Sequence, residues 1–113
     1  MNRIAITIFA TVAAVLSARS ASSQTPDPHG MKVFADQKCA LCHSIAGKGN
    51  TKGALDAVGT KLKPEDIRKW IVTPAEMSAA AKATRKPPMK AYANLPKADL
   101  DALVAYLASL KGK

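Results

Sequence analysis

The segment Cys39-Ala40-Leu41-Cys42-His43 constrains this chain more than any other part of its sequence. A Cys-x-x-Cys-His pattern is the attachment signature of c-type haem. Each thiol would add across one haem vinyl group, and the spacing of three places both thiols on one side of about one helical turn. His43 follows directly, so its imidazole is the expected proximal ligand of the iron.

Closely spaced cysteines also occur in disulfides, in thioredoxin-like redox pairs and in zinc sites. A redox pair normally lies in a βαβ setting, and this sequence shows no such pattern. Zinc needs a fourth ligand, and the only other histidine is His29. We therefore favour covalent haem over these three alternatives.

The N-terminal segment has the layout of a secretory signal peptide. Met1–Arg3 is a short basic start, Ile4–Ala18 is an apolar run of 15 residues, and Arg19–Gln24 is small and polar. Ala21 and Ser23 are small residues at the minus three and minus one positions of a cleavage after Ser23. We therefore expect cleavage at that point.

Such a cleavage would leave one small domain. We expect residues 1–23 to be the signal peptide and residues 24–113 to be a single monohaem domain in the periplasm. An uncleaved membrane anchor is the alternative, but the apolar run is shorter than the roughly 20 residues of a typical span. No stable membrane insertion is expected after cleavage. A domain of this size buries a modest fraction of its surface, so a covalently held haem would add material to its core.

The expected fold class is all-α, because no stretch shows the alternation of a strand between turn signals. Proline is tolerated at the first helical position, which places Pro64 at a helix start, and Thr73 with Glu76 has the pattern of a capping box. Four helices are expected, over Gly30–Lys38, Pro64–Val72, Pro74 to about Ala83, and Lys97–Leu110.

The last expected helix carries an apolar stripe at spacings of three and four. The stripe consists of Leu100, Leu103, Val104, Leu107 and Leu110. We expect it to belong to the core and to form the wall against which the first helix packs. Ser44–Gly59 is rich in glycine and Thr84–Pro96 is rich in proline, so both are expected to be loops.

The haem iron needs either a sixth ligand or an open position. Met31, Met77, Met89 and His29 are the candidates in residues 24–113. Met77 lies inside an expected helix, where a methionine is more often part of the core. Met89 follows two consecutive prolines, and a loop stiffened in this way suits delivery of a thioether to the far face of the haem. Met89 is therefore the expected ligand and His29 the second choice, because Met/His ligation is the electron-transfer pattern.

Three blocks of the sequence resemble the class I c-type cytochromes of the small soluble bacterial kind. These blocks are Gln37–Ser44, Ile67–Pro74 and Met89–Leu110, and they occur in the family's order. The resemblance implies an all-α cytochrome c fold. In that fold short helices wrap one covalently bound haem, and the N- and C-terminal helices cross.

The same resemblance assigns roles to individual residues. Cys39 and Cys42 match the cysteines that carry the haem, and His43 matches the proximal iron ligand. Met89 matches the distal iron ligand, and Trp70 matches an aromatic residue that packs beside the haem. The implied cofactor is one covalent haem c with its iron.

Two positions depart from the family pattern. Gly53 stands where the family usually has a proline whose carbonyl accepts the N–H of the proximal histidine. A carbonyl remains there, but the loop is less rigid. Phe34 resembles the residue of the first helix that contacts the last helix in this family. It lies five residues before Cys39, where four is commoner, and one extra residue rotates a helix face by about 100°. Either the helix bulges or unwinds near Lys38 and Phe34 keeps its contact with the last helix, or Ala35 takes that contact.

The chain is strongly basic, with 17 lysines and arginines against 8 acidic residues and a formal net charge of +9. Lys38, Lys48, Lys86 and Lys90 flank the two segments expected to frame the haem edge. A basic face there would steer the protein toward acidic redox partners, such as a dehydrogenase or a terminal oxidase or reductase. Nucleic acid is not an expected partner, since export is expected and no aromatic residues alternate with the basic ones.

These features predict a periplasmic one-electron carrier with His/Met-ligated haem c and no enzymatic reaction of its own. The alternative is a haem c electron-transfer subunit of a periplasmic dehydrogenase. A peroxidase or small-gas-binding protein ranks lower, because it would need an open distal position and a catalytic histidine or arginine. Arg85 is the only arginine near Met89, and nothing in the sequence marks it as catalytic.

Overall fold

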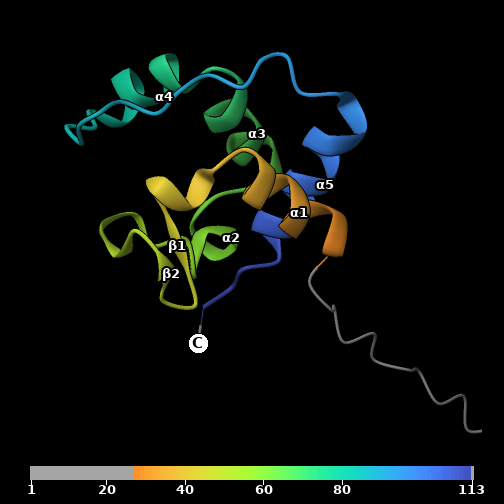
Figure 1. The fold of residues 1–113 in the computed structure, drawn as a ribbon. Coiled ribbons are helices and arrows are strands. Elements are labelled where there is room, and N and C mark those ends of the chain that lie inside the picture. Colours follow the sequence, from red (N-terminus) through yellow and green to blue (C-terminus); the bar gives the residue numbers. More distant parts are fainter. Residues whose placement is uncertain (1–26, 113) are drawn as a thin grey trace, which may run out of the picture.

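Helices carry the fold of residues 27–112, which are the residues that the computed structural model describes (Figure 1). The predicted all-α class is confirmed, and a two-stranded hairpin is the only sheet in this part of the chain. The predicted signal peptide, residues 1–23, lies outside the described residues. In chain order the elements are α1 (Pro28–Asp36), the 3-10 turn η1 (Cys39–Leu41), β1 (Ser44–Ile45), β2 (Lys48–Gly49), the 3-10 turn η2 (Thr51–Gly53), α2 (Val58–Lys61), α3 (Pro64–Val72), α4 (Pro74–Ala81) and α5 (Lys97–Ala108).

Local chemistry sets both ends of α1. The Asp27 carboxylate caps the helix by accepting a hydrogen bond from the backbone N–H of His29 at 2.9 Å, and Pro28 occupies the first helical position. The helix ends at Asp36, before the predicted end at Lys38. Lys38 adopts a left-handed backbone with a φ of 57°, which stops the helix and turns the chain into η1.

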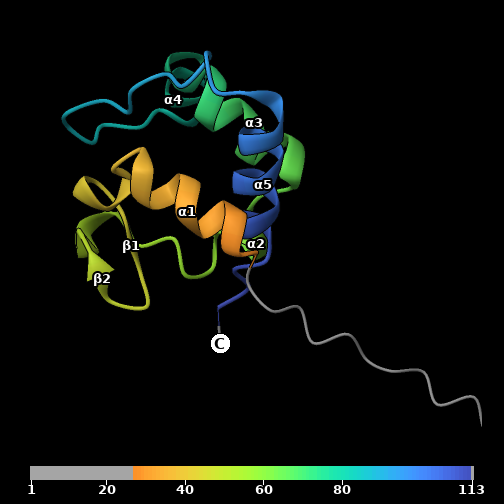
Figure 2. The same cartoon turned by 45° about the vertical axis from the view of Figure 1, so that its right-hand side comes forward.

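α1 packs across α5, as predicted (Figures 1 and 2). The approach is close because Gly30 has no side chain. A Cβ at this position would lie 2.3 Å from the Ala102 carbonyl oxygen and 2.4 Å from the Tyr106 Cβ. One helical turn later, Phe34 meets the Tyr106 ring edge-on, with centroids 6.3 Å apart and an interplanar angle of 81°.

This contact settles which residue of α1 faces the last helix. Phe34 is buried, whereas Ala35 is exposed. The left-handed backbone of Lys38 therefore accommodates the extra residue before Cys39. The sequence left two arrangements open, and the structure has the one in which the helix unwinds near Lys38 and Phe34 keeps its contact with α5.

α3 and α4 follow each other with a single residue between them. α3 has the predicted bounds, and α4 ends at Ala81, slightly earlier than predicted. The predicted capping box of Thr73 and Glu76 is wrong, because no side-chain hydrogen bond caps α4. The Thr73 hydroxyl donates instead to the Lys69 carbonyl at 3.1 Å. Since Thr73 also terminates α3, its hydroxyl serves the last turn of that helix and not the first turn of the next.

The segment predicted as a loop between the motif and α3 contains short regular elements. β1 and β2 pair antiparallel, with Ser44 opposite Gly49. Ala46 and Gly47 form the turn, with φ values of 52° and 76°. Positive φ at both central residues is typical of the two-residue hairpin turn that matches strand twist. Strands of two residues leave no alternation in the sequence, which is why the pattern did not predict them.

The core lies where α1, α3 and α5 meet. The predicted stripe on α5 is buried at Leu103, Val104 and Leu107, and it is partly buried at Leu100 and Leu110. Together with these three, the core contains Val33, Phe34, Ile67, Ile71, Ala102 and Tyr106. This is a small core for a domain of this length, and it borders a large cavity.

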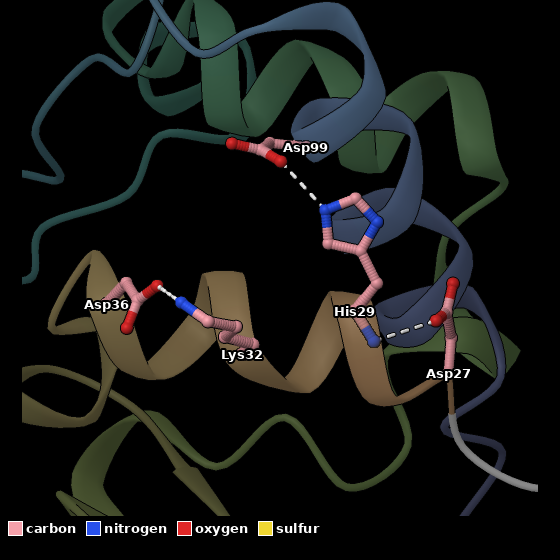
Figure 3. A network of polar contacts seen from close by, with 5 residues as sticks. All are labelled: Asp27, His29, Lys32, Asp36 and Asp99. Carbon is pink, nitrogen blue, oxygen red and sulfur yellow. Dashed lines mark hydrogen bonds and ion pairs between the residues drawn. The ribbon is translucent and has the colours of Figure 1, made fainter.

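Polar contacts lie at the surface along α1 and between α1 and α5 (Figure 3). His29 at the start of α1 places its Nε2 atom 2.7 Å from the Asp99 carboxylate of α5. Lys32 and Asp36 pair one turn apart along α1. All four side chains are open to solvent, so these pairs contribute little to stability.

Candidate haem-binding site

A cavity of about 910 Å³ opens between the attachment segment, residues 37–43, and the distal loop, residues 84–96. Figure 2 shows α1 and η1 on one side of this space and the distal loop with α4 on the other. The volume is near the upper end of the roughly 300–1,000 Å³ found for ligand sites. The space is therefore the size of a cofactor site and much larger than a packing defect.

The walls of the cavity are mostly apolar and are continuous with the core. The core helices and the segment before α3 contribute Phe34, Leu55, Val58, Leu62, Ile67, Ile71, Leu103 and Leu107. Five of these side chains are also members of the buried core. A large apolar group in this space would complete the interior of a domain that buries little surface by itself.

The 3-10 turn η1 and the residue after it present the two thiols. Cys39 is half-buried, Cys42 is exposed, and no disulfide joins them. Burial raises the pKa of the Cys39 thiol to about 11, so this thiol is protonated at neutral pH. A thioredoxin-like pair works through a cysteine of lowered pKa, and the pKa of Cys39 is shifted in the opposite direction. Within residues 27–112, no group of three or more His, Cys, Asp or Glu side chains gathers into a metal-binding cluster.

A backbone carbonyl orients the imidazole of His43. The His43 Nδ1 atom lies 2.9 Å from the Gly53 carbonyl oxygen. Because a carbonyl only accepts, Nδ1 carries the proton and Nε2 keeps its lone pair for a metal. Burial lowers the pKa of His43, while the bond to Gly53 opposes that shift. The imidazole is thus held in the neutral form that a metal requires. The sequence left this bond possible because Gly53 keeps its carbonyl, and the structure shows the contact.

Among the four candidates for the distal ligand, Met89 is the one that lines this cavity. It is half-buried and packs against the core. Met77 lines a second cavity, of about 500 Å³, between α2, α3 and α4. Met31 is exposed on α1, and His29 pairs with Asp99 at the N-terminal end of that helix. The structure therefore brings Met89, and none of the other three, together with the attachment segment.

Trp70 lies on α3 between the two cavities. Its side chain is half-buried and lines both of them. This placement is compatible with the packing role that the resemblance implies for it.

Two polar residues, Arg85 and Asn50, make contacts at the site that the sequence did not predict. Arg85 of the distal loop donates from Nη2 to the Cys42 carbonyl oxygen. Asn50 donates from Nδ2 to the Leu41 carbonyl at 3.3 Å, and its backbone N–H donates to the His43 carbonyl at 3.0 Å. Gly53, which stands where the family usually has a proline, was the one sequence feature that could have indicated the Arg85 contact, because a residue without a side chain leaves space for a neighbour. No sequence feature pointed to Asn50.

Three of the four lysines predicted at the haem edge line the cavity, namely Lys38, Lys86 and Lys90. Lys48 lies on β2 and is exposed, but it is not part of the lining. Lys52, which the sequence analysis did not single out, is part of it.

The residues of this cavity fit a haem held through two thioethers and one imidazole, which places the molecule in the class of c-type haem proteins. Comparison with known proteins narrows that class. A family model described as "Cytochrome c" matches residues 29–111, and the chain belongs to this family. Its cofactor is therefore covalently bound haem c with its iron.

One similar protein is "Cytochrome c oxidase subunit 2" of Alkalihalophilus pseudofirmus. The two sequences are 28% identical over 98 residues, which is 79% of this chain and 27% of the relative. The chain thus spans about a quarter of the length of the relative that it matches.

Proposed function

We propose that this protein is a periplasmic one-electron carrier whose haem c is ligated by His43 and Met89. One observation carries the proposal: of the candidate distal ligands, Met89 alone lines the cavity of the attachment segment. An imidazole and a thioether as axial ligands form an electron-transfer pattern. Membership of the cytochrome c family supports haem-based electron transfer as the activity.

When bound, haem supplies the one-electron chemistry by alternating between ferric and ferrous iron. Cys39 and Cys42 would hold it covalently, and the Gly53 carbonyl would fix the orientation of His43 and raise its basicity. Met89 would be the second protein ligand of the iron, and its sulfur would exclude small molecules and favour the reduced state. In this proposal no residue of the chain is catalytic.

A redox titration of the holoprotein tests the proposal. We expect one reversible one-electron transition, a ferric charge-transfer band diagnostic of methionine ligation, and no carbon monoxide binding by the ferrous form at neutral pH. Rapid carbon monoxide binding would indicate an open distal position and a gas-binding or peroxidase role instead. A peroxidase or gas-binding protein would need a catalytic histidine or arginine at the distal side, whereas the Arg85 guanidinium is bonded to the Cys42 carbonyl. This contact supports the electron carrier.

The rim of the cavity suits an acidic partner. Lys38, Lys86 and Lys90 line it, and Leu41, between the two cysteines, is 72% exposed. Positive charges around an exposed apolar side chain steer the encounter and leave an apolar contact for the partner. We propose an acidic redox protein, either a dehydrogenase or a terminal oxidase or reductase, as the docking partner.

Charge reversal at this rim should slow electron transfer. Lys86→Glu is expected to lower the second-order rate constant at low salt about tenfold, the low end of what electrostatic steering provides. The difference should shrink as the Debye length falls to about 8 Å at physiological ionic strength. Lys63→Glu is the matched control, since Lys63 is exposed and lines neither cavity. Equal slowing by both variants would assign the effect to net charge and not to docking at the rim.

The partner decides between a free shuttle and a subunit of a larger enzyme. Similarity to a cytochrome c oxidase subunit favours a terminal oxidase as the electron acceptor. A haem subunit of a periplasmic dehydrogenase is the other arrangement. Purification at low salt, followed by identification of the acidic protein that stays bound, distinguishes an oxidase, a dehydrogenase and a freely diffusing carrier.

We propose that residues 1–23 direct export and are then removed. The apolar run of this segment is short for a membrane span. Within residues 27–112, no helix is long and apolar enough to cross a membrane. N-terminal sequencing of the periplasmic protein should therefore begin at Gln24. Protein that begins at Met1 and is recovered in the membrane fraction would show that the segment acts as an anchor.

A further inference from the structure

We propose that Arg85 is a positioning residue that fastens the distal loop to the attachment segment and thereby keeps Met89 on the iron. The inference rests on the proposed ligation by Met89. It adds a residue that neither the motif nor the family resemblance assigns to ligation.

The first observation is the contact itself. The Arg85 guanidinium donates from Nη2 to the carbonyl oxygen of Cys42, which carries one of the two thiols. This bond joins residues 43 positions apart, from opposite sides of the cavity. A charged donor makes a stronger hydrogen bond to a carbonyl than a neutral one does.

The second observation is the space that the guanidinium occupies. A Cβ at Gly53 would lie 2.2 Å from Arg85 Nη1 and 2.2 Å from the Cys42 carbonyl oxygen. A side chain at position 53, including the proline that the family usually has there, would displace the guanidinium. The glycine therefore serves two neighbours, because its carbonyl orients His43 and its bare Cα admits Arg85.

The third observation is how little else holds this part of the loop. Among the described residues, no backbone hydrogen bond involves residues 84–91, and the side chain of Arg85 makes the one hydrogen bond of this stretch. The next fastening is Tyr92, whose N–H donates to the Ile71 carbonyl at 2.9 Å. Its hydroxyl also makes a long bond of 3.4 Å to the Gln37 carbonyl. Met89 thus lies between two anchored positions, and Arg85 is the anchor on its N-terminal side.

A ligand on a loop leaves a metal when the loop moves away, and the cost of that motion depends on the contacts that must break. The bond from Arg85 to Cys42 is such a contact, because it ties the Met89 loop to the segment that is covalently joined to the haem. Loss of the bond should increase the population in which Met89 is displaced, while both thioethers stay in place.

The test measures the displacement of methionine in ferric holoprotein by added imidazole, followed through the methionine charge-transfer band. Arg85→Met is expected to increase the rate of displacement about tenfold, which corresponds to about 1.4 kcal/mol, near the contribution of one charge-assisted hydrogen bond. Arg85→Lys keeps the charge and a donor group on a side chain of different shape, so its rate of displacement should fall between those of Arg85→Met and wild type.

Lys82→Met is the matched control. Lys82 is an exposed cation three positions away that lines neither cavity, so its loss changes the net charge equally. This variant should match wild type. If Lys82→Met and Arg85→Met increase the rate of methionine displacement equally, the increase comes from the change in net charge, and the proposal is overturned.

Two further outcomes separate this inference from the function on which it rests. If wild type shows the band and Arg85→Met exchanges methionine at the wild-type rate, Arg85 does not position Met89, and the ligation stands. If wild type lacks the band, the ligation by Met89 fails and the inference fails with it. Should Arg85→Met not fold with haem, the comparison of Arg85→Lys with wild type and Lys82→Met decides the question in the same way.

Discussion

Replacing both Cys39 and Cys42 with alanine should nearly abolish the haem-containing protein, and each single replacement should leave at most one thioether. A covalent link makes haem binding intramolecular, with an effective concentration in the millimolar range for a short tether. Without it, the haem is lost on dilution. Denaturation of wild type followed by acid–acetone extraction should leave the haem on the polypeptide, and mass spectrometry should show the added mass.

Leu41→Ala is the control for these variants, since Leu41 stands between the cysteines and is exposed. It should retain haem with both thioethers. The double variant should also be less stable, because the core is small and borders a cavity of about 910 Å³ that the haem would fill. Free extraction of haem from wild type would show that attachment is not covalent.

Met89→Ala should lower the reduction potential by on the order of 100 mV, because axial ligands tune haem potentials over about 0.8 V. Loss of the Met89 sulfur removes a ligand that favours ferrous iron and opens a coordination position. The ferric methionine band should disappear, carbon monoxide should bind to the ferrous protein, and a weak peroxidase activity should appear. Potentiometry and absorption spectroscopy of the same sample check these outcomes.

Met77→Ala is the matched variant, with the same side chain removed from the second cavity. It should keep the band and the potential, and it should lose some stability because Met77 is half-buried. Survival of the band in Met89→Ala together with its loss in Met77→Ala would reverse the ligand assignment.

Parts of the fold followed from patterns that are local in the sequence. α3 begins at the predicted residue, Pro64, because proline is tolerated at the first position of a helix and disrupts a helix interior. The stripe on α5 is core where its spacing predicted it, at Leu103, Val104 and Leu107. The prediction was wrong at Thr73, because this residue adjoins two helices and its hydroxyl bonds to α3 and does not cap α4. The hairpin was not predicted, because its two-residue strands are too short to show a period.

The assembly of the site required contacts that no local pattern encodes. The Nδ1 of His43 bonds to Gly53, ten positions away, and the carbonyl of Cys42 accepts from Arg85. The extra residue before Cys39 left two arrangements of α1 open, and only the backbone at Lys38 selected one.

The sequence by itself determined the covalent chemistry of this protein, because two thiols and an imidazole within five residues form a haem-attachment motif that does not depend on the fold of the other segments. It also indicated helices, since their periodicity and their proline starts are read within a few turns. The tertiary structure decided which methionine shares a cavity with that motif and which side chains hold the motif and the distal loop together. Those choices depend on the path of the chain between distant positions, and that path is set by packing of the whole core rather than by any one segment.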